Sequence, residues 1–173
     1  MENRITFFKG LRSTTPVETL NLSEVLAKIK EGKWKDKVDK CKIDLKYKDF
    51  LPCFTPTGIF SHRSIAGMES YNGIICLDID HVENPQELKE KAQKLSYVHA
   101  AFITPSGKGL KVIILTNGDV DGYKENELKV SSAFFHDTGA SRDNRCKDIA
   151  RIQFVSYDPE LYYNSESQIF NVC

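Results

Sequence analysis

Residues 73–80 read GIICLDID, and the rest of the chain is best understood by working outward from them. Positions 73–79 form a near-continuous apolar run, which is typical of a strand buried on both faces. Asp78 and Asp80 come at the end of this run, two residues apart, so both carboxylates project to one face of the strand. The sequence therefore predicts a buried strand that ends in paired carboxylates. The alternative is an ordinary strand end that enters a polar loop.

The pattern after this strand alternates between helical and extended segments. Asn84 and Pro85 mark a helix start. We then predict strands at 98–103 and 110–115, a helix from 122 to about 135, and a last strand at 149–155. This β-α-β-β-α-β order is that of an RNA-recognition-motif-like or ferredoxin-like sheet, over about residues 73–156. Right-handed crossovers give the strand order 4-1-3-2, which places the strand 73–79 centrally, next to the last strand.

The first 70 residues predict a smaller α/β module. Residues 5–8 have the pattern of a short strand, and a helix is expected from Asn21 to Gly32. A second, weaker helix follows, with an apolar side formed by Trp34, Val38, Cys41 and Leu45. We therefore expect an α+β protein with a single domain over 1–173, composed of an N-terminal module (1–70) and an RNA-recognition-motif-like half (71–173).

Composition excludes several classes of protein. The 173 residues are 40% hydrophobic and 28% charged with a formal net charge of zero, so bulk charge does not indicate a nucleic-acid-binding protein. The sequence has no apolar run of the length that a membrane span needs. The five cysteines lack Cys-x-x-Cys spacing, which argues against a zinc site or disulfide framework and favours a cytoplasmic protein. The nine lysines between Lys28 and Lys48 suggest a solvated helix face or, alternatively, a basic patch that binds a nucleic-acid backbone.

A second motif occupies residues 104–111, which read TPSGKGLK. The spacing is not that of a Walker A loop. Two glycines around a lysine still allow the backbone to approach a phosphate, and two lysines can add charge. The candidate nucleotide-binding residues are Ser106, Gly107, Lys108, Gly109 and Lys111. A plain hairpin turn is the alternative interpretation.

A third motif occupies residues 143–151, which read DNRCKDIAR. In the predicted topology Asp143 completes the carboxylate set of Asp78 and Asp80, and Arg151 points toward a phosphate group. The alternative is a surface loop with internal ion pairs. Arg63 is a further candidate cation, which the sequence does not place. Carboxylates, a glycine turn and cations at one sheet edge are the parts of a phosphoryl- or nucleotidyl-transfer site that uses Mg²⁺ or Mn²⁺.

The order and spacing of these motifs resemble those of the archaeo-eukaryotic primase superfamily. More closely, the chain is similar to the N-terminal primase-like domain of virulence-associated-protein-E-type replication proteins of mobile elements. The opening Phe7-Phe8-Lys9-Gly10 and the stretch 151–159 share this likeness, which spans nearly the whole chain.

The resemblance implies a primase-polymerase fold and two-metal nucleotidyl transfer. It assigns Asp78, Asp80 and Asp143 to catalysis and metal binding, and the second motif to nucleotide binding. One position departs from the pattern: Lys111 stands where the superfamily usually has a phosphate-binding histidine. The implied partners are a nucleoside triphosphate, single-stranded or primed DNA, and a helicase domain or subunit.

Two alternatives stay open at this stage. One is a catalytically inactive nucleic-acid-binding module of a replication protein, and the other is a different Mg²⁺-dependent phosphoryl-transfer enzyme built on the same carboxylates. Asp78→Asn is expected to relieve the repulsion between the carboxylates of Asp78 and Asp80, and therefore to leave folding unharmed or slightly improved.

Overall fold

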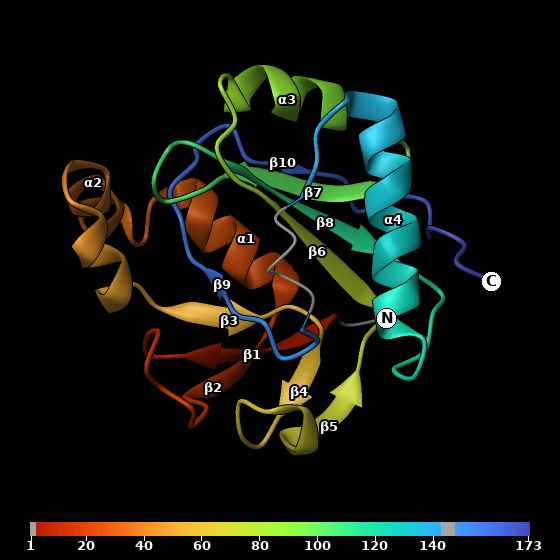
Figure 1. Cartoon of the computed structure of the whole chain (residues 1–173). Helices are drawn as coiled ribbons and strands as arrows, with labels where there is room; N and C mark the ends of the chain where they lie inside the picture. Colours follow the sequence, from red (N-terminus) through yellow and green to blue (C-terminus); the bar gives the residue numbers. More distant parts are fainter. Residues whose placement is uncertain (1–2, 143–147) are drawn as a thin grey trace.

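The structure is a computed structural model that describes residues 3–142 and 148–173. Its strands in this part of the chain are β1 (Arg4–Phe8), β2 (Glu18–Asn21), β3 (Cys53–Thr55), β4 (Gly58–Phe60), β5 (Met68–Tyr71), β6 (Ile74–Ile79), β7 (Val98–Ile103), β8 (Leu110–Leu115), β9 (Gln153–Phe154) and β10 (Tyr162–Tyr163). The helices are α1 (Leu22–Glu31), α2 (Lys35–Ile43), α3 (Pro85–Ala92) and α4 (Tyr123–Thr138), with 3-10 helices η1 (Leu45–Phe50) and η2 (Ile65–Gly67) (Figure 1). No helix in the described ranges combines the length and apolar character that crossing a membrane requires.

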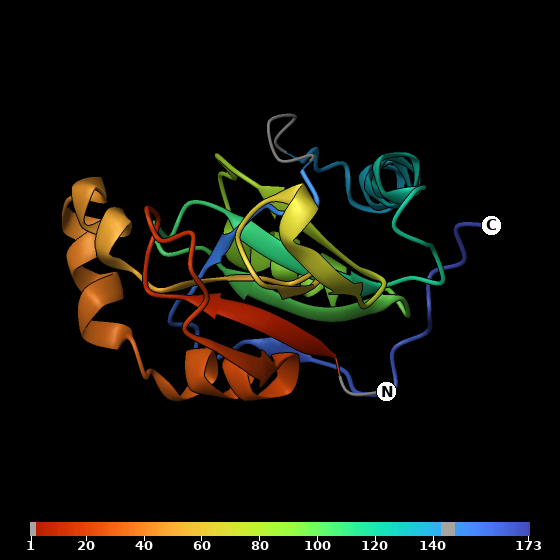
Figure 2. The same ribbon diagram turned by 90° about the horizontal axis from the view of Figure 1, so that it is seen from below.

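The main sheet has the order β10-β7-β8-β6, with all neighbours antiparallel. Its faces follow the alternation of side chains along each strand. Ile75, Leu77 and Ile79 of β6 pack on the face covered by α3 and α4, while Ile74 and Cys76 pack on the opposite face. Figure 2 shows α4 and α1 on opposite sides of this sheet.

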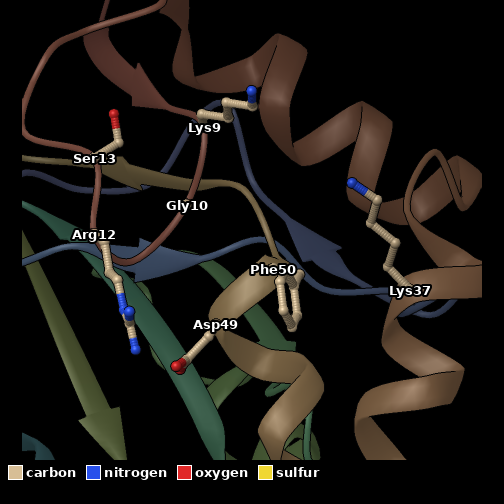
Figure 3. Close-up of a pocket in the computed structure, with 7 residues that line it drawn as sticks. All are labelled: Lys9, Gly10, Arg12, Ser13, Lys37, Asp49 and Phe50. Carbon is tan, nitrogen blue, oxygen red and sulfur yellow. The ribbon is translucent and has the colours of Figure 1, made fainter.

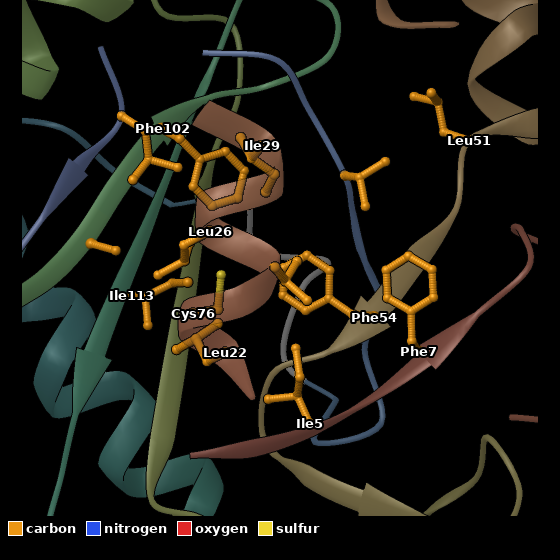
Figure 4. Packing of buried hydrophobic residues seen from close by; sticks show 14 of the residues in the cluster. Ile5, Phe7, Leu22, Leu26, Ile29, Leu51, Phe54, Cys76, Phe102 and Ile113 are labelled. Carbon is orange, nitrogen blue, oxygen red and sulfur yellow. The ribbon is translucent and has the colours of Figure 1, made fainter. Parts of the chain in front are cut away.

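The first sheet has the order β2-β1-β3-β9 and lies on the α1 side of the main sheet. Because β9 comes from the second half of the chain, residues outside the N-terminal module complete this sheet. One hydrophobic core fills the space between the two sheets and α1, with Phe7 and Phe54 from the first sheet and Phe102 and Ile113 from the main sheet (Figure 4). The two sheets therefore depend on each other for burial.

The strand order differs from the predicted 4-1-3-2 in its fourth member. The predicted strands at 73–79, 98–103 and 110–115 are present and paired as expected, with β8 between β6 and β7. The predicted strand 149–155, however, shortens to β9 and pairs with β3 of the first sheet, so β6 is an edge strand of the main sheet. Hydrogen bonds from the Val155 amide to the Pro52 carbonyl, and from the Thr57 hydroxyl to the Ile149 carbonyl, hold this segment on the first sheet.

The predicted helices are confirmed, and their boundaries have local causes. The apolar stripe of α1 is buried, and Gly32 ends the helix with a φ of 83°, a conformation that glycine adopts without strain. The Asn84 side chain caps α3 by accepting a hydrogen bond from the Glu87 amide at 3.2 Å, and Pro85 is the first helical residue. The predicted apolar side of the second helix is present only in part, because Leu45 lies in η1 and is 61% exposed.

Candidate active site

Asp78 and Lys111 face each other on neighbouring strands. They are register partners in the β6–β8 pair, and Lys111 Nζ lies 2.8 Å from Asp78 Oδ2. Alternation explains the arrangement, because Asp78 shares a face with Cys76, and Lys111 shares it with Ile113. The ion pair is therefore directed between the two sheets, where only 3% of Lys111 is exposed.

A buried ammonium group needs polar partners, and Lys111 has them on both sheets. Besides its ion pair with Asp78, Lys111 Nζ donates a hydrogen bond of 2.5 Å to Gln153 Oε1. Gln153 is buried and belongs to β9. Because β9 pairs with β3, this bond ties the main sheet to the first sheet beside the carboxylates.

A pocket of about 300 Å³, the Asp78 pocket, opens beside this ion pair. Segments far apart in the sequence contribute its wall: Leu11, Lys48, Arg63, Asp78, Asp80, Lys111, Asp148, Ala150, Arg151, Ile152 and Phe154. The first motif and the described part of the third motif thus line one pocket, although they do so across two sheets rather than along one. The sequence did not predict this arrangement across two sheets, because the apolar pattern of a strand does not identify the strand with which it pairs.

Both acidic and basic side chains line the Asp78 pocket. Three carboxylates line it, those of Asp78, Asp80 and Asp148. Four cationic side chains line it as well: Lys48, Arg63, Lys111 and Arg151. Planar guanidinium groups and ammonium groups both suit phosphate oxygens, while clustered carboxylates suit hard divalent cations. The pocket therefore has the chemistry to hold a phosphate-bearing ligand together with a metal ion.

Lys48 was not predicted as a site residue, because no motif contains it, whereas Arg63 was a candidate cation that the sequence could not place. Arg63 Nη1 donates a 2.6 Å hydrogen bond to the Leu11 carbonyl, which fixes its side chain at the pocket wall. Burial raises the pKa of the neighbouring Cys53 thiol to about 11, and Arg63 offsets only part of this shift. The thiol is therefore neutral at physiological pH and does not cancel the charge of Arg63. Lys48 Nζ lies 5.0 Å from the centre of the Phe154 ring, within the range of a cation–π contact.

The second motif forms the turn between β7 and β8. The Thr104 amide donates to the Gly109 carbonyl and the Gly107 amide donates to the Thr104 carbonyl, both at 2.9 Å. Gly107 has a φ of 74°, and a Cβ on Gly109 would lie only 2.6 Å from the Ile79 carbonyl oxygen. Among the described residues that line the Asp78 pocket, Lys111 comes from this motif, while Ser106, Gly107, Lys108 and Gly109 do not line it. The two glycines are accounted for by turn geometry and close packing.

The third motif is described only in part. Asp143, predicted as a catalytic and metal-binding residue, lies outside the described residues. Asp148 and Arg151 are described, and both line the Asp78 pocket. The Asp148 side chain also accepts a hydrogen bond from the Ala150 amide at 2.9 Å, which shapes the turn before β9.

The stretch 151–159 contains a structural anchor in addition to Arg151. Asp158 forms an ion pair of 2.8 Å with Lys89 of α3, and both side chains are almost fully buried. Asp158 also accepts a hydrogen bond from the Ile103 amide at the end of β7. This pair ties α3 and the chain after β9 to the end of β7, close to the turn of the second motif.

The described carboxylates are compatible with a divalent metal ion. Within residues 3–142 and 148–173, no three His, Cys, Asp or Glu side chains are arranged to hold a metal by themselves. Mg²⁺ usually binds through one or two carboxylates and takes waters and substrate phosphates as its other ligands. Asp78 and Asp80 on the wall of one pocket match that requirement.

Comparison with solved structures gives the class of fold. The AEP domain of the cyanophage S-2L primase-polymerase is similar, with a TM-score of 0.51 and 13% sequence identity over 98% of this chain and 84% of that chain. The protein therefore has an α+β, primase-polymerase-like fold, as the sequence predicted.

The family is defined by sequence. Residues 46–163 match the model of the family described as BT4734-like, N-terminal domain, and the chain belongs to this family. This segment includes β6, β8 and every residue of the Asp78 pocket except Leu11. A search of curated proteins finds no match.

Proposed function

We propose that this protein is a primase-polymerase-type nucleotidyltransferase domain that binds a nucleoside triphosphate in the Asp78 pocket. The observation that carries the proposal is the set of three carboxylates and four cations lining one pocket, at the strand ends of a primase-polymerase-like fold. Neither charge set alone would suit a metal-bound triphosphate, whereas the two together do.

The cationic side chains would bind the triphosphate. Arg63 and Arg151 offer planar forks for phosphate oxygens, and Lys48 adds a point charge. Lys111 would hold a phosphate oxygen in place of the histidine that is usual in the resembled superfamily, while its bond to Gln153 fixes its position. The turn residues Ser106, Gly107, Lys108 and Gly109 belong to this proposal as a second layer around the nucleotide.

The acidic side chains would hold one or two Mg²⁺ or Mn²⁺ ions. Asp78 and Asp80 are the ligands on β6 and directly after it, and Asp143 is the third proposed ligand. A metal bound there supplies charge stabilisation for the triphosphate and lowers the pKa of an attacking hydroxyl group. Asp148 is a further carboxylate on the wall of the same pocket, where it would position Arg151 or a metal-bound water.

Calorimetry tests this proposal. The protein is titrated with a nucleoside triphosphate with and without Mn²⁺, and binding is expected only when the metal is present. Asp80→Asn should abolish the metal-dependent part, because it removes one of two neighbouring carboxylates. Asp121→Asn is the matched control, since Asp121 is exposed and lies outside the pocket. Extension of a primed DNA template by the wild type, and not by Asp80→Asn, would complete the test.

Triphosphate binding that is indifferent to both Mn²⁺ and Asp80 would count against the enzyme. One observation favours the alternative, a catalytically inactive nucleic-acid-binding module: the Lys111 ammonium already engages Asp78. That function predicts DNA binding without metal dependence and no extension of a primer.

The biological setting is proposed from the sequence resemblance. It is DNA replication of a mobile element or phage, in which the domain works with a helicase domain or subunit and acts on single-stranded or primed DNA. Stimulation of primer synthesis by the helicase of the same element would support this setting.

A further inference from the structure

A second and larger pocket, of about 500 Å³, lies beside the Asp78 pocket. We call it the Phe50 pocket. Its wall consists of residues from the loop after β1, among them Lys9 and Arg12, together with Lys37 of α2 and the end of η1 at Asp49 and Phe50. Figure 3 shows the loop on one side and Lys37 on the other, with Phe50 between them.

The Phe50 pocket carries an excess of positive charge. Lys9, Arg12 and Lys37 are exposed, and Asp49 is the only acidic residue among the described residues of its wall. None of the three cations forms a salt bridge within residues 3–142 and 148–173. Basic side chains without a carboxylate partner remain available to an anionic ligand. Three separated cations suit a ligand with several phosphates, such as a nucleic-acid backbone.

The aromatic ring of Phe50 adds a second kind of contact. Phe50 is 70% exposed although it is one of the largest apolar side chains. An exposed ring surrounded by cations is the combination with which proteins bind single-stranded nucleic acid, because bases stack on the ring and phosphates contact the charges. A free inorganic anion would use the cations but not the ring.

The wall of the Phe50 pocket is held in place before any ligand binds. Arg63 donates from its backbone amide to the Thr14 carbonyl and from its side chain to the Leu11 carbonyl, which fixes the loop from both ends. Gly10 lies so close to η1 that a Cβ there would be 3.1 Å from the Asp49 carbonyl oxygen. A preformed wall lowers the entropic cost of ordering a flexible strand on it.

The two pockets are adjacent along two segments of chain. Leu11 lines the Asp78 pocket, while its neighbours Gly10 and Arg12 line the Phe50 pocket. Lys48 and Asp49 divide in the same way between the two pockets. A single nucleic-acid strand could therefore pass from one pocket to the other across the loop after β1 and the 3-10 helix η1.

From these contacts we infer that the Phe50 pocket binds a nucleotide of single-stranded nucleic acid. The base stacks on Phe50, and the flanking phosphates contact Lys9, Arg12 and Lys37. The strand then continues to the Asp78 pocket, where it serves as the template; this last step rests on the proposed function, whereas the stacking and phosphate contacts do not.

Fluorescence anisotropy with a labelled oligothymidine, in the absence of divalent metal, tests the stacking contact. Phe50→Leu keeps an apolar side chain but loses the flat ring, and should weaken binding about tenfold, the scale of one base–aromatic stack. Phe50→Tyr keeps the ring and should bind within about twofold of the wild type. Phe135→Leu is the matched control, because Phe135 is 52% exposed on the distant helix α4 and should leave affinity unchanged.

A salt titration tests the phosphate contacts independently. The slope of log K against log salt changes by about 0.7 for each phosphate contact with a single strand. The double variant Lys9→Gln/Lys37→Gln should therefore reduce the slope by about 1.4. The control pair Lys94→Gln/Lys124→Gln removes the same charge from exposed positions elsewhere and should leave the slope unchanged.

The inference is overturned if Phe50→Leu binds the strand as tightly as the wild type, or if Phe50→Tyr binds as weakly as Phe50→Leu. It is also overturned if free thymidine monophosphate competes as well as the strand, since the pocket would then be a mononucleotide site. If the Phe50 pocket does not bind single-stranded nucleic acid, the Mn²⁺-dependent binding of a triphosphate in the Asp78 pocket is still expected. Failure of the proposed function would instead remove triphosphate binding from the wild type and leave the Phe50 effect in place.

Discussion

At the scale of single residues, Lys111 links the candidate chemistry to the fold. Its ammonium bonds both Asp78 and Gln153, so one side chain contacts a carboxylate of the site and a buried amide of the other sheet. Lys111, which the sequence offered as a candidate nucleotide-binding residue, lines the same pocket as Asp78. The sequence did not predict Gln153, because a glutamine in a strand carries no signal of its partner.

Lys111→Ala is expected to weaken Mn²⁺-dependent triphosphate binding by about 1.5–3 kcal/mol, the scale of a lost charge-assisted hydrogen bond. Calorimetry provides the measurement. Lys124→Ala, at an exposed position on α4, is the charge-matched control and should bind like the wild type. An unchanged affinity in Lys111→Ala would remove this lysine from the proposed triphosphate site.

The stability of Asp78→Asn should differ from the sequence-based expectation. Relief of carboxylate repulsion suggested a neutral or improved fold, but Asp78 is paired with a buried ammonium. An amide at position 78 leaves that charge without its counter-ion, so we expect the free energy of unfolding to fall by about 1–3 kcal/mol. Urea denaturation measures it, with Asp121→Asn as the unaffected control. A variant at least as stable as the wild type would restore the repulsion argument.

At the scale of elements, α3 is anchored by the pair between Lys89 and Asp158. Lys89→Met removes the buried ammonium and leaves the Asp158 carboxylate buried without its counter-ion. The expected loss is about 3–5 kcal/mol of unfolding free energy, measured by denaturant titration. Lys91→Met on the same helix breaks only an exposed pair with Glu87 and should cost less than about 1 kcal/mol. Equal effects of the two changes would contradict the anchoring role.

The contact of β7 with the C-terminal segment should be sensitive to acid through His99. Burial lowers the pKa of His99 below its usual value, and the imidazole is hydrogen-bonded to Ser167 at 2.9 Å. Because the unfolded chain binds this proton more readily, stability is fully present above about pH 6.5 and falls as the pH drops toward the folded-state pKa.

One such proton gives a slope of at most about 1.4 kcal/mol per pH unit. Unfolding free energies measured between pH 7.5 and 5 should therefore decline less steeply in His99→Gln than in the wild type. Identical slopes would show that His99 does not contribute to the acid sensitivity.

At the scale of the whole molecule, the two sheets share one core, while a second core lies between the main sheet and the helices α3 and α4. Phe54→Ala and Phe102→Ala, on different sheets, should each lower the stability of a single cooperative transition by about 3–5 kcal/mol. Fluorescence of Trp34 and far-ultraviolet circular dichroism should report the same midpoint in each variant. Two separate transitions would contradict a shared core.

Much of this protein was determined by local sequence. The apolar run at 74–79, the helical spacing of Leu22, Val25, Leu26 and Ile29, and the caps at Asn84 and Gly32 act over a few residues, so they predicted elements correctly. The antiparallel order of the strands 73–79, 110–115 and 98–103 followed as well, because short connections limit the ways in which neighbouring strands can pair.

Only the tertiary structure decided where the segment 149–155 pairs. Its apolar pattern suits any open sheet edge, and in the structure it pairs with β3 instead of β6. That choice brought Gln153 to Lys111, and Arg151 and Asp148 to Asp78, while the packing of the loop after β1 brought Arg63 to the same place. Strand pairing and pocket formation are contacts between residues distant in sequence, whose energies depend on all the surfaces competing for them. For this reason the sequence alone predicted Asp78, Asp80, Lys111 and Arg151 as site residues, but neither Lys48 nor the strand pairing that brings these residues together.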